Sequence, residues 1–230
     1  MMRSHQEEWM DDPQVPEELL REGLDGLARV NSVLFGHGPS VQGVFALAGG
    51  RRRLSVLDVG TGCADTARRL VEGARSRSVD LYVRGIDRSL PTVDHARHRC
   101  IAYPEIEISL QDLFTLRDDE TFDVVHAALL LHHLDDDQAV EALRLMFRHS
   151  HLGVVINDLH RHRLAYESAR VALPLISRSP MVRHDGPLSV LRGFTREELF
   201  DLVARAGIGP ARIRWWPFFR WQILISRDGL

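Results

Sequence analysis

The chain has 230 residues, of which 44% are hydrophobic, enough to bury the core of one domain. Its 29 Lys and Arg residues against 32 Asp and Glu residues give a net charge of −3, which provides no general attraction to nucleic acid or to an anionic membrane. All 29 cations are arginine, so a Schiff-base lysine, a pyridoxal-binding lysine and a P-loop lysine are excluded.

The N-terminal region is predicted to form a helical lid over residues 1–50. Its first fourteen residues are polar and acidic, and we expect them to be frayed. A helix is signalled at Pro16, because proline suits the first helical turn and the acidic residues after it suit the positive end of the helix dipole. Apolar residues then recur at helical spacing, at Leu20, Leu24, Leu27, Val30 and Leu34, and Gly36 ends the helix. A second, short helix is expected over 41–47.

Residues 56–65, with the sequence VLDVGTGCAD, are typical of a buried strand running into a glycine turn that opens a helix. In a dinucleotide-binding turn, the glycines bring backbone N–H groups and a helix N-terminus to a pyrophosphate. The carboxylate of Asp58, two residues before Gly60, would place negative charge close to that phosphate. S-adenosylmethionine has no phosphate, and its sulfonium and amino group are cationic. Asp58 therefore favours S-adenosylmethionine.

The rest of the chain alternates strands and helices, which is the pattern of a doubly wound parallel sheet. Strands are expected near 54–59, 80–86, 105–110, 122–128 and 152–157, and helices near 63–74, 91–99 and 136–148. A capping box at 195–198 begins a further helix that runs to about Ala206. Strands at about 211–216 and 219–226 form an antiparallel hairpin. We therefore predict an α/β, Rossmann-like fold with a seven-stranded, mostly parallel sheet whose last strand is antiparallel.

An insertion at about 159–194 follows the fifth strand. We expect a helix from Arg163 to Ser177 and then a loop that contains Pro180, Gly186 and Pro187. Because open sheets bind ligands at the carboxyl ends of their strands, this segment is predicted to close over that edge as a substrate lid of the 51–230 domain. The lid residues expected to face a largely apolar ligand are Leu164, Tyr166, Val171, Leu173, Leu175, Ile176 and Met181.

The order of these motifs resembles that of the class I S-adenosylmethionine-dependent methyltransferases, over roughly residues 50–160. The family's first motif is acid-x-Gly-x-Gly-x-Gly, and here Ala64 takes the place of the third glycine. The next strands end in Asp87, in Gln111-Asp112 and in His126, and a Leu-His-His-Leu segment follows at 131–134. The resemblance implies S-adenosylmethionine as cofactor and S-adenosylhomocysteine as product.

The resemblance also implies a role for each motif residue. The backbone at Gly60, Thr61 and Gly62 would approach the amino-acid part of the cofactor, and Asp58 would hold its ammonium. The remaining cofactor contacts would be Asp87 on the ribose hydroxyls, Arg88 on the adenine face, Asp112 on the adenine amino group with Gln111 and Leu113 beside it, and Ala127 near the methyl donor.

Methyl transfer is an in-line displacement, so the protein chiefly positions the nucleophile and, for a hydroxyl, removes its proton. A neutral imidazole suits that task near neutral pH. His132 and His133 follow the fourth strand and His160 follows the fifth, and these three are the candidate bases. Alternatively, one histidine of the 131–134 segment is architectural, or His133 caps the next helix. Further candidate substrate contacts are His162, Tyr166 and Arg192.

Metal chemistry is not expected from these motifs. Catechol-type methyltransferases bind magnesium through an acid after the fourth strand and an Asp-Asn pair after the fifth. Here the fourth strand ends in His126 and the later pair is reversed, Asn157-Asp158, so the hard oxygen ligands are incomplete. The two cysteines, Cys63 and Cys100, are far apart in sequence and suggest neither a disulfide nor a zinc site.

A looser resemblance, over residues 9–13, 157–162 and 189–192, is to small bacterial methyltransferases of secondary metabolism, some of which accompany type III polyketide synthases. It implies O-methylation of a phenolic or polyketide hydroxyl. The alternatives are C- or N-methylation of a quinone-like or other small metabolite, and a non-catalytic protein that binds the cofactor. We expect an apolar or aromatic small-molecule substrate, neither nucleic acid nor membrane as partner, and a cytoplasmic location. A homodimer through the N-terminal helix stays open.

Overall fold

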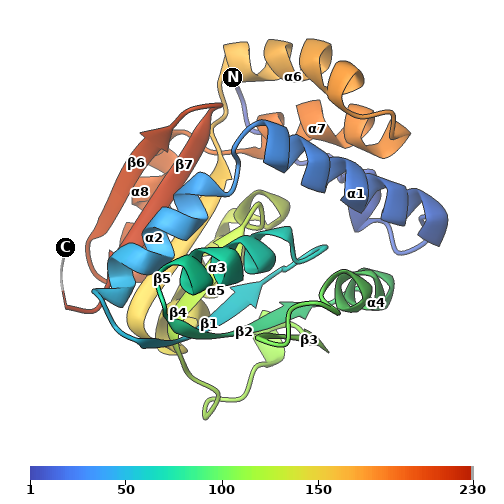
Figure 1. Cartoon of the computed structure of the whole chain (residues 1–230). Coiled ribbons are helices and arrows are strands. Elements are labelled where there is room, and N and C mark those ends of the chain that lie inside the picture. Colours follow the sequence, from blue (N-terminus) through green and yellow to red (C-terminus); the bar gives the residue numbers. More distant parts are fainter. Residues whose placement is uncertain (229–230) are drawn as a thin grey trace.

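The computed structural model describes residues 1–228 and contains one seven-stranded sheet in the order β3-β2-β1-β4-β5-β7-β6 (Figure 1). Its strands are β1 (Arg53–Val59), β2 (Asp80–Asp87), β3 (Ile106–Leu110), β4 (Phe122–Ala128), β5 (Ser150–Leu159), β6 (Ala211–Trp216) and β7 (Arg220–Ser226). The first five strands pair in parallel, whereas β7 lies between β5 and β6 and runs antiparallel to both. The predicted α/β fold and its antiparallel last strand are confirmed.

Helices cover both faces of this sheet. They are α1 (Glu17–Val33), α2 (Gly38–Ala48), α3 (Asp65–Ser76), α4 (Leu90–Arg99), α5 (Asp136–Arg148), α6 (Arg163–Ile176), α7 (Pro180–Arg192) and α8 (Arg196–Ala206). Val56 packs with α2, α3 and α4 on one face, and its neighbour Leu57 packs with α5 and α8 on the other. Because both faces are buried, the central strands are continuous apolar runs rather than alternating ones.

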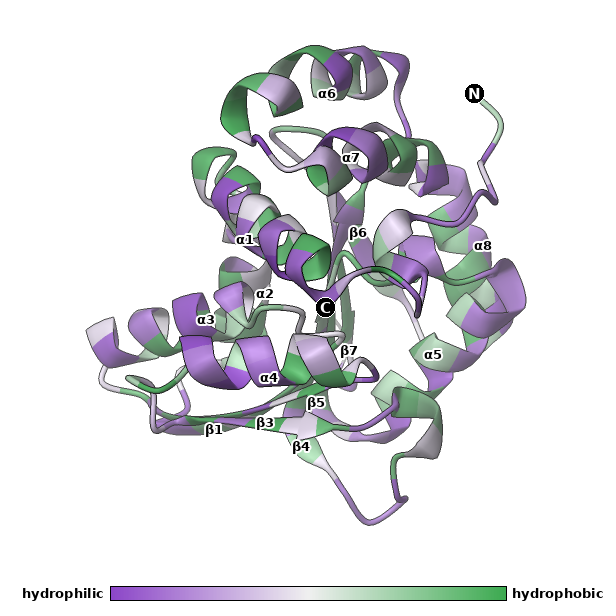
Figure 2. Cartoon of the chain, turned by 90° about the vertical axis from the view of Figure 1, so that its right-hand side faces the viewer, coloured by the Kyte–Doolittle hydropathy of each residue, from purple (hydrophilic) through white to green (hydrophobic). Residues whose placement is uncertain are grey.

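Three helices form a cap that lies away from the sheet layers, namely α1, α6 and α7 (Figures 1 and 2). In this cap α7 packs against both α1 and α6. The predicted N-terminal lid of residues 1–50 is too long, because α2 packs on the sheet against β4, β5 and β7, where Val44 and Ala48 are buried. The cap therefore comprises the first 33 residues together with the insertion after β5.

The prediction of a loop around Pro180, Gly186 and Pro187 is wrong, because these residues lie in helix α7. Pro180 occupies the first helical turn, where a backbone N–H has no intrahelical partner in any case. The side chains of Met181 and Val182 are 1% exposed against α1 and α6. This burial stabilises a helix whose local sequence signals a loop.

The expectation of a frayed N-terminus is also wrong. The Ser4 amide donates to the Leu191 carbonyl at 3.1 Å, and the Arg3 side chain donates to the Arg192 carbonyl at 2.8 Å. The Trp9 amide, in a short 3-10 turn η1 (Trp9–Asp11), donates to Asp185 at 2.9 Å. These contacts join residues more than 170 positions apart in the sequence, and they hold the segment in place. Local sequence patterns cannot predict them.

The described helices, which end before residue 229, include none long and apolar enough to cross a membrane.

Candidate active site

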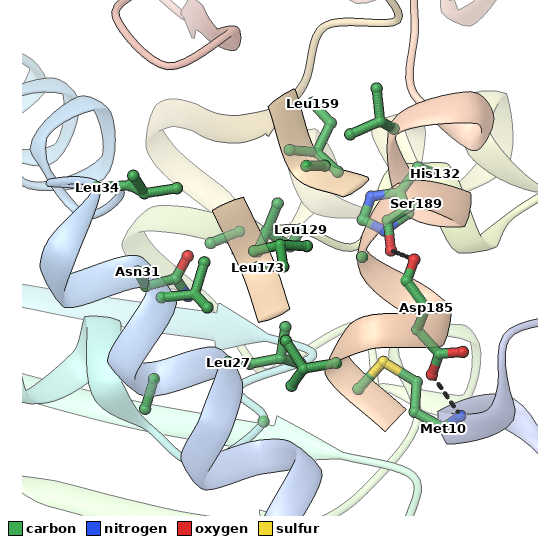
Figure 3. A pocket seen from close by; sticks show the side chains of 18 of the residues that line it. Met10, Leu27, Asn31, Leu34, Leu129, His132, Leu159, Leu173, Asp185 and Ser189 are labelled. Atoms are coloured by element: carbon green, nitrogen blue, oxygen red, sulfur yellow. Dashed lines mark hydrogen bonds between the residues drawn. The ribbon is translucent and has the colours of Figure 1, made fainter. Parts of the chain in front are cut away.

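A cavity of about 470 Å³ lies between the carboxyl edge of the sheet and the cap. Its walls are largely apolar, and Figure 3 shows Leu27, Leu34, Leu129 and Leu173 along them. One end is polar and is lined by Glu8, His132, His133, Asp185 and Ser189. A volume of this size suits a small organic ligand whose orientation is fixed by a few polar groups.

The predicted glycine turn lines the same cavity. Gly60 and Gly62 adopt left-handed backbone conformations, with φ of 66° and 54°, which glycine accepts without strain. A Cβ atom on Gly60 would lie 2.9 Å from Leu130 Cδ1, so the turn also needs the missing side chain. Gly60, Thr61 and Gly62 all line the cavity.

Asp58 lies at the base of this turn and is 2% exposed. One carboxylate oxygen accepts a hydrogen bond from His126 Nδ1 at 2.6 Å, and the other accepts one from Thr61 Oγ1 at 2.7 Å. Both partners orient the carboxylate and hold Thr61 in the turn. Asp58 also lines the cavity, so a cationic ligand there would meet a fixed negative charge.

Asp87, at the end of β2, supports the turn from the other side. Its two carboxylate oxygens accept from the amides of Gly62 at 3.2 Å and Ser89 at 3.0 Å. Burial raises the pKa of Asp87 above its usual value, although these two amide donors oppose that shift. Asp112, at the end of β3, accepts from the Phe114 amide at 3.0 Å. Both acids lie at the carboxyl ends of neighbouring parallel strands, and neither is among the residues that line the cavity.

The polar end of the cavity contains two histidines, each oriented by a carboxylate. The Nδ1 atom of His132 lies 2.7 Å from Asp158 Oδ1, and the Nδ1 atom of His133 lies 2.8 Å from Asp11 Oδ2. An ionised carboxylate only accepts hydrogen bonds, so Nδ1 carries a proton in each ring and Nε2 is the ring nitrogen left for another partner. The two ring centroids are 4.3 Å apart.

Both orienting carboxylates are held in the charged form. Burial opposes ionisation of Asp158, but its contact with His132 outweighs burial and lowers the pKa of Asp158. Burial also opposes ionisation of Asp11, and its contact with His133 lowers the pKa of Asp11 in the same way. The imidazoles are therefore fixed as hydrogen-bond donors toward the protein, and their Nε2 atoms remain available for other partners.

Glu8 completes this end of the cavity and comes from the N-terminal segment. Its side chain is 1% exposed, and burial raises the pKa of Glu8 to about 7. Oε2 accepts from Ser189 Oγ at 2.8 Å, but Oε1 has no hydrogen-bond partner among the described residues. Oε1 lies 3.7 Å from His132 Nε2. We call Glu8, His132 and His133 the polar corner.

Residues 56–153, which include the glycine turn and the strands ending in Asp87, Asp112 and His126, match the family model described as a methyltransferase domain. The chain holds a methyltransferase domain with the class I fold. Its cofactor is S-adenosylmethionine, which agrees with the fixed acids at the cavity and with the absence of any lysine for phosphate. No curated protein sequence matches the chain.

Solved methyltransferase structures share the fold of this methyltransferase at low sequence identity. Magnesium protoporphyrin IX methyltransferase from Synechocystis PCC 6803 with bound S-adenosylmethionine is 18% identical, with a TM-score of 0.55 over 84% of this chain and 79% of that one. The plantazolicin methyltransferase in complex with S-adenosylhomocysteine is 12% identical, with a TM-score of 0.65 over 91% and 95%. Human N-acetylserotonin methyltransferase is 15% identical, with a TM-score of 0.63 over 94% and 57%.

Several predicted site residues of the methyltransferase lie outside the cavity lining. His160 packs against Trp221, with ring centroids 4.5 Å apart, and His162 accepts from the Leu164 amide at the start of α6. Tyr166 lies under the Arg170 guanidinium, whose Cζ is 5.6 Å from the centroid of the tyrosine ring. The candidate base His160 and the candidate substrate contacts His162 and Tyr166 are therefore not among the residues that line the cavity, although His162 stacks on Phe219, which does line it.

Four other predicted contacts do not line the cavity. Leu113 and Ala127 belong to the core on the α5 side of the sheet. The Gln111 side chain accepts from Arg84 at 2.6 Å, which holds it in a polar network outside the cavity. Arg88 is largely exposed and lies 3.8 Å from Asp11. In each case the side-chain direction along the strand end decides the outcome, and a motif alone does not give it.

Arg192 positions the polar corner rather than a substrate. Its guanidinium donates to the backbone carbonyls of His132 and His133, both at 2.9 Å, and to that of Gln6. The loop after β4 and the N-terminal segment are thereby joined through one buried side chain. His133 does not cap α5, because Asp135 accepts from the Gln138 amide and forms that cap.

Two groups of apolar residues also differ from expectation. Leu173 and Met181 line the cavity as predicted, but Leu164, Val171 and Leu175 are 62%, 69% and 83% exposed on the outer face of α6. Phe218 and Phe219, at the turn of the terminal hairpin, also line the cavity, although the sequence did not indicate this. The signal that could have found them is the aromatic turn between two strands at the carboxyl edge.

Proposed function

We propose that this methyltransferase transfers the methyl group of S-adenosylmethionine to a hydroxyl oxygen of a small, largely apolar molecule such as a phenol or polyketide. The observation that carries the proposal is the cavity, in which apolar walls lead to two carboxylate-oriented imidazoles beside the glycine turn. An apolar body with one hydroxyl matches this distribution of surfaces.

The cofactor would place its amino-acid part against the turn at residues 58–62, which lines the cavity. Its ribose hydroxyls would face Asp87, with Arg88 and Asp112 farther along the same sheet edge. In this orientation the sulfonium methyl would face the cavity and the loop that follows β4. The same loop carries His132 and His133, so methyl donor and acceptor meet at the polar corner.

The reaction that we propose is a histidine-assisted in-line displacement. The acceptor hydroxyl loses its proton at the polar corner, and an oxygen lone pair forms the new bond to the methyl carbon. The carbon–sulfur bond breaks at the same time and its electron pair stays on sulfur, which gives neutral S-adenosylhomocysteine. The chain contributes mainly by holding the two reactants in line and by lowering the cost of removing the proton.

The test of this function is a panel of phenols with increasing alkyl length, incubated with S-adenosylmethionine that carries a ¹³C-labelled methyl group. We expect a labelled methoxy product, observed by mass spectrometry and by carbon NMR. A label on a ring carbon would contradict O-methylation and show C-methylation. A label on nitrogen would likewise show N-methylation. Tight cofactor binding without any transfer across the panel would instead support a non-catalytic binding protein.

Replacing Asp87 by alanine is expected to weaken S-adenosylmethionine binding by at least ~1.5 kcal/mol, because a carboxylate that accepts from ribose hydroxyls is lost. Isothermal titration calorimetry measures this change directly. Asp94→Ala is the matched control, since Asp94 is an exposed acid on α4 that pairs with Arg97. Equal affinity in the Asp87 and Asp94 variants would refute the ribose assignment.

A further inference from the structure

We propose that the polar corner of Glu8, His132 and His133 is a binding site for a divalent transition cation of the Zn²⁺ type, with one coordination position open to the acceptor oxygen. Its part in methyl transfer rests on the proposed function, whereas cation binding itself stands on the geometry of the corner. The three side chains converge from the N-terminal segment and from the loop after β4.

The spacing of the three side chains suits a cation. One ligand atom from each of Glu8, His132 and His133 lies within 4.8 Å of the others. His132 Nε2 and Glu8 Oε1 are 3.7 Å apart, too far for a hydrogen bond between them. A cation about 2.1 Å from each of its ligand atoms separates neighbouring ligands by roughly 3 to 4 Å. The corner therefore needs little rearrangement to close around an ion.

The surroundings of the two imidazoles match those of metal ligands. A histidine that binds a metal through Nε2 usually donates its Nδ1–H to a carboxylate, which fixes the ring and raises its basicity. His132 donates in this way to Asp158 at 2.7 Å, and His133 donates to Asp11 at 2.8 Å. A general base needs one oriented imidazole. Two imidazoles oriented separately beside a carboxylate are the pattern of a ligand set.

Glu8 supplies an independent observation. It is 2% exposed, and its Oε1 atom has no partner among residues 1–228 although a buried carboxylate oxygen is costly to leave unpaired. Arg192 is the nearest guanidinium, with Nε 3.7 Å from Oε1. Its N–H groups are directed to the carbonyls of Gln6, His132 and His133 instead. A cation at the corner would give Oε1 its missing partner.

The ligand chemistry explains why the sequence did not indicate this site. Our expectation that no metal binds considered hard oxygen ligands for magnesium after β4 and β5. Two imidazoles and one carboxylate are a different donor set, suited to Zn²⁺ or Fe²⁺, and three protein ligands leave a position for substrate. The third ligand, Glu8, lies in a segment that the sequence predicted to be frayed.

With a cation at the polar corner, the histidines would assist deprotonation by holding the cation that binds the acceptor oxygen. A hydroxyl oxygen that becomes a ligand of a divalent cation has a lower pKa and releases its proton to solvent near neutral pH. The bound oxygen then keeps a lone pair for attack on the methyl carbon. The favoured acceptors are molecules whose hydroxyl reaches the corner while their apolar part lies along Leu27, Leu129 and Leu173.

The test titrates Zn²⁺ into the chelator-treated, tag-free protein by calorimetry, and Co²⁺ with detection of its visible absorption. We expect one equivalent to bind and Glu8→Gln to lower the affinity at least tenfold. Asp11→Asn, which removes only an orienting acceptor, is expected to lower it roughly 10- to 100-fold. His160→Gln is the control, because His160 lies outside the cavity, and it should bind as tightly as the unmodified chain.

Circular dichroism of each variant shows whether it is folded. Affinity that is equal in the Glu8, Asp11 and His160 variants would overturn the proposal, as would the lack of a bound equivalent in the unmodified chain. Undiminished hydroxyl methylation without any bound cation would also overturn it, while leaving the proposed function intact with imidazole as the base. One bound equivalent with no transfer to any hydroxyl would support the cation site and reject the proposed function.

Discussion

His132→Asn is expected to lower kcat for methyl transfer by about 10²- to 10⁴-fold, the usual contribution of a group that assists proton removal. An asparagine amide can still donate to Asp158 from near the position of Nδ1, but it has no atom at the position of Nε2. The substitution therefore removes the atom that faces the acceptor while keeping the hydrogen bond that fixes the loop. Steady-state kinetics with a phenol that the unmodified chain methylates measures the loss.

The same variant is expected to bind S-adenosylmethionine with unchanged affinity, because the cofactor contacts that we propose lie in the glycine turn at residues 58–62. His160→Asn is the matched control, and its kcat should stay close to that of the unmodified chain, since His160 packs against Trp221 outside the cavity. Full activity in the His132 variant, or an equal loss in both variants, would contradict the assignment of the polar corner.

Asp58→Ala is expected to lower the free energy of unfolding by about 3 kcal/mol, because it leaves buried polar groups without an acceptor. His126 is fully buried and donates to Asp58 at 2.6 Å, and Thr61 Oγ1 donates to it at 2.7 Å. Asp58→Asn should cost less, since an amide oxygen still accepts one of these bonds. Urea denaturation of the unmodified chain, Asp58→Asn and Asp58→Ala measures their free energies of unfolding, which we expect to fall in that order.

Loss of Asp58 should also weaken cofactor binding, because the carboxylate is the fixed negative charge beside residues 60–62. Asp94→Ala, an exposed substitution on α4, is the reference for the effect of removing any acid from the chain. An Asp58→Ala variant that unfolds at the urea concentration of the unmodified chain would show that the contact with His126 contributes nothing to stability.

The elements of the sheet could be predicted because their signals are local. Apolar runs such as those around Val56 and Val124 indicate buried strands, and Gly60 and Gly62 mark a turn that requires left-handed backbone. Helix α7 could not be predicted, because Pro180 signals a loop and only burial against α1 and α6 reveals the helix. Tertiary packing here outweighs local propensity.

The part of the site that is built from short local motifs could also be predicted from the sequence. The Asp58 turn and the His132-His133 pair are short motifs, and both line the cavity. Glu8 and Asp11 were missed, because they meet these histidines across more than 120 residues of sequence and no periodicity encodes that contact. The choice between His132 and His160 depends on side-chain direction at two neighbouring strand ends. Packing against the terminal hairpin decides it.

The most direct measurement of the central claim is a crystal structure with S-adenosylhomocysteine and a phenol bound together. The account predicts the cofactor's amino-acid part against residues 58–62, its sulfur facing the loop after β4, and the phenol oxygen between that sulfur and the polar corner of Glu8, His132 and His133. A sulfur turned away from His132 and His133, or a phenol oxygen held elsewhere in the cavity, would contradict it.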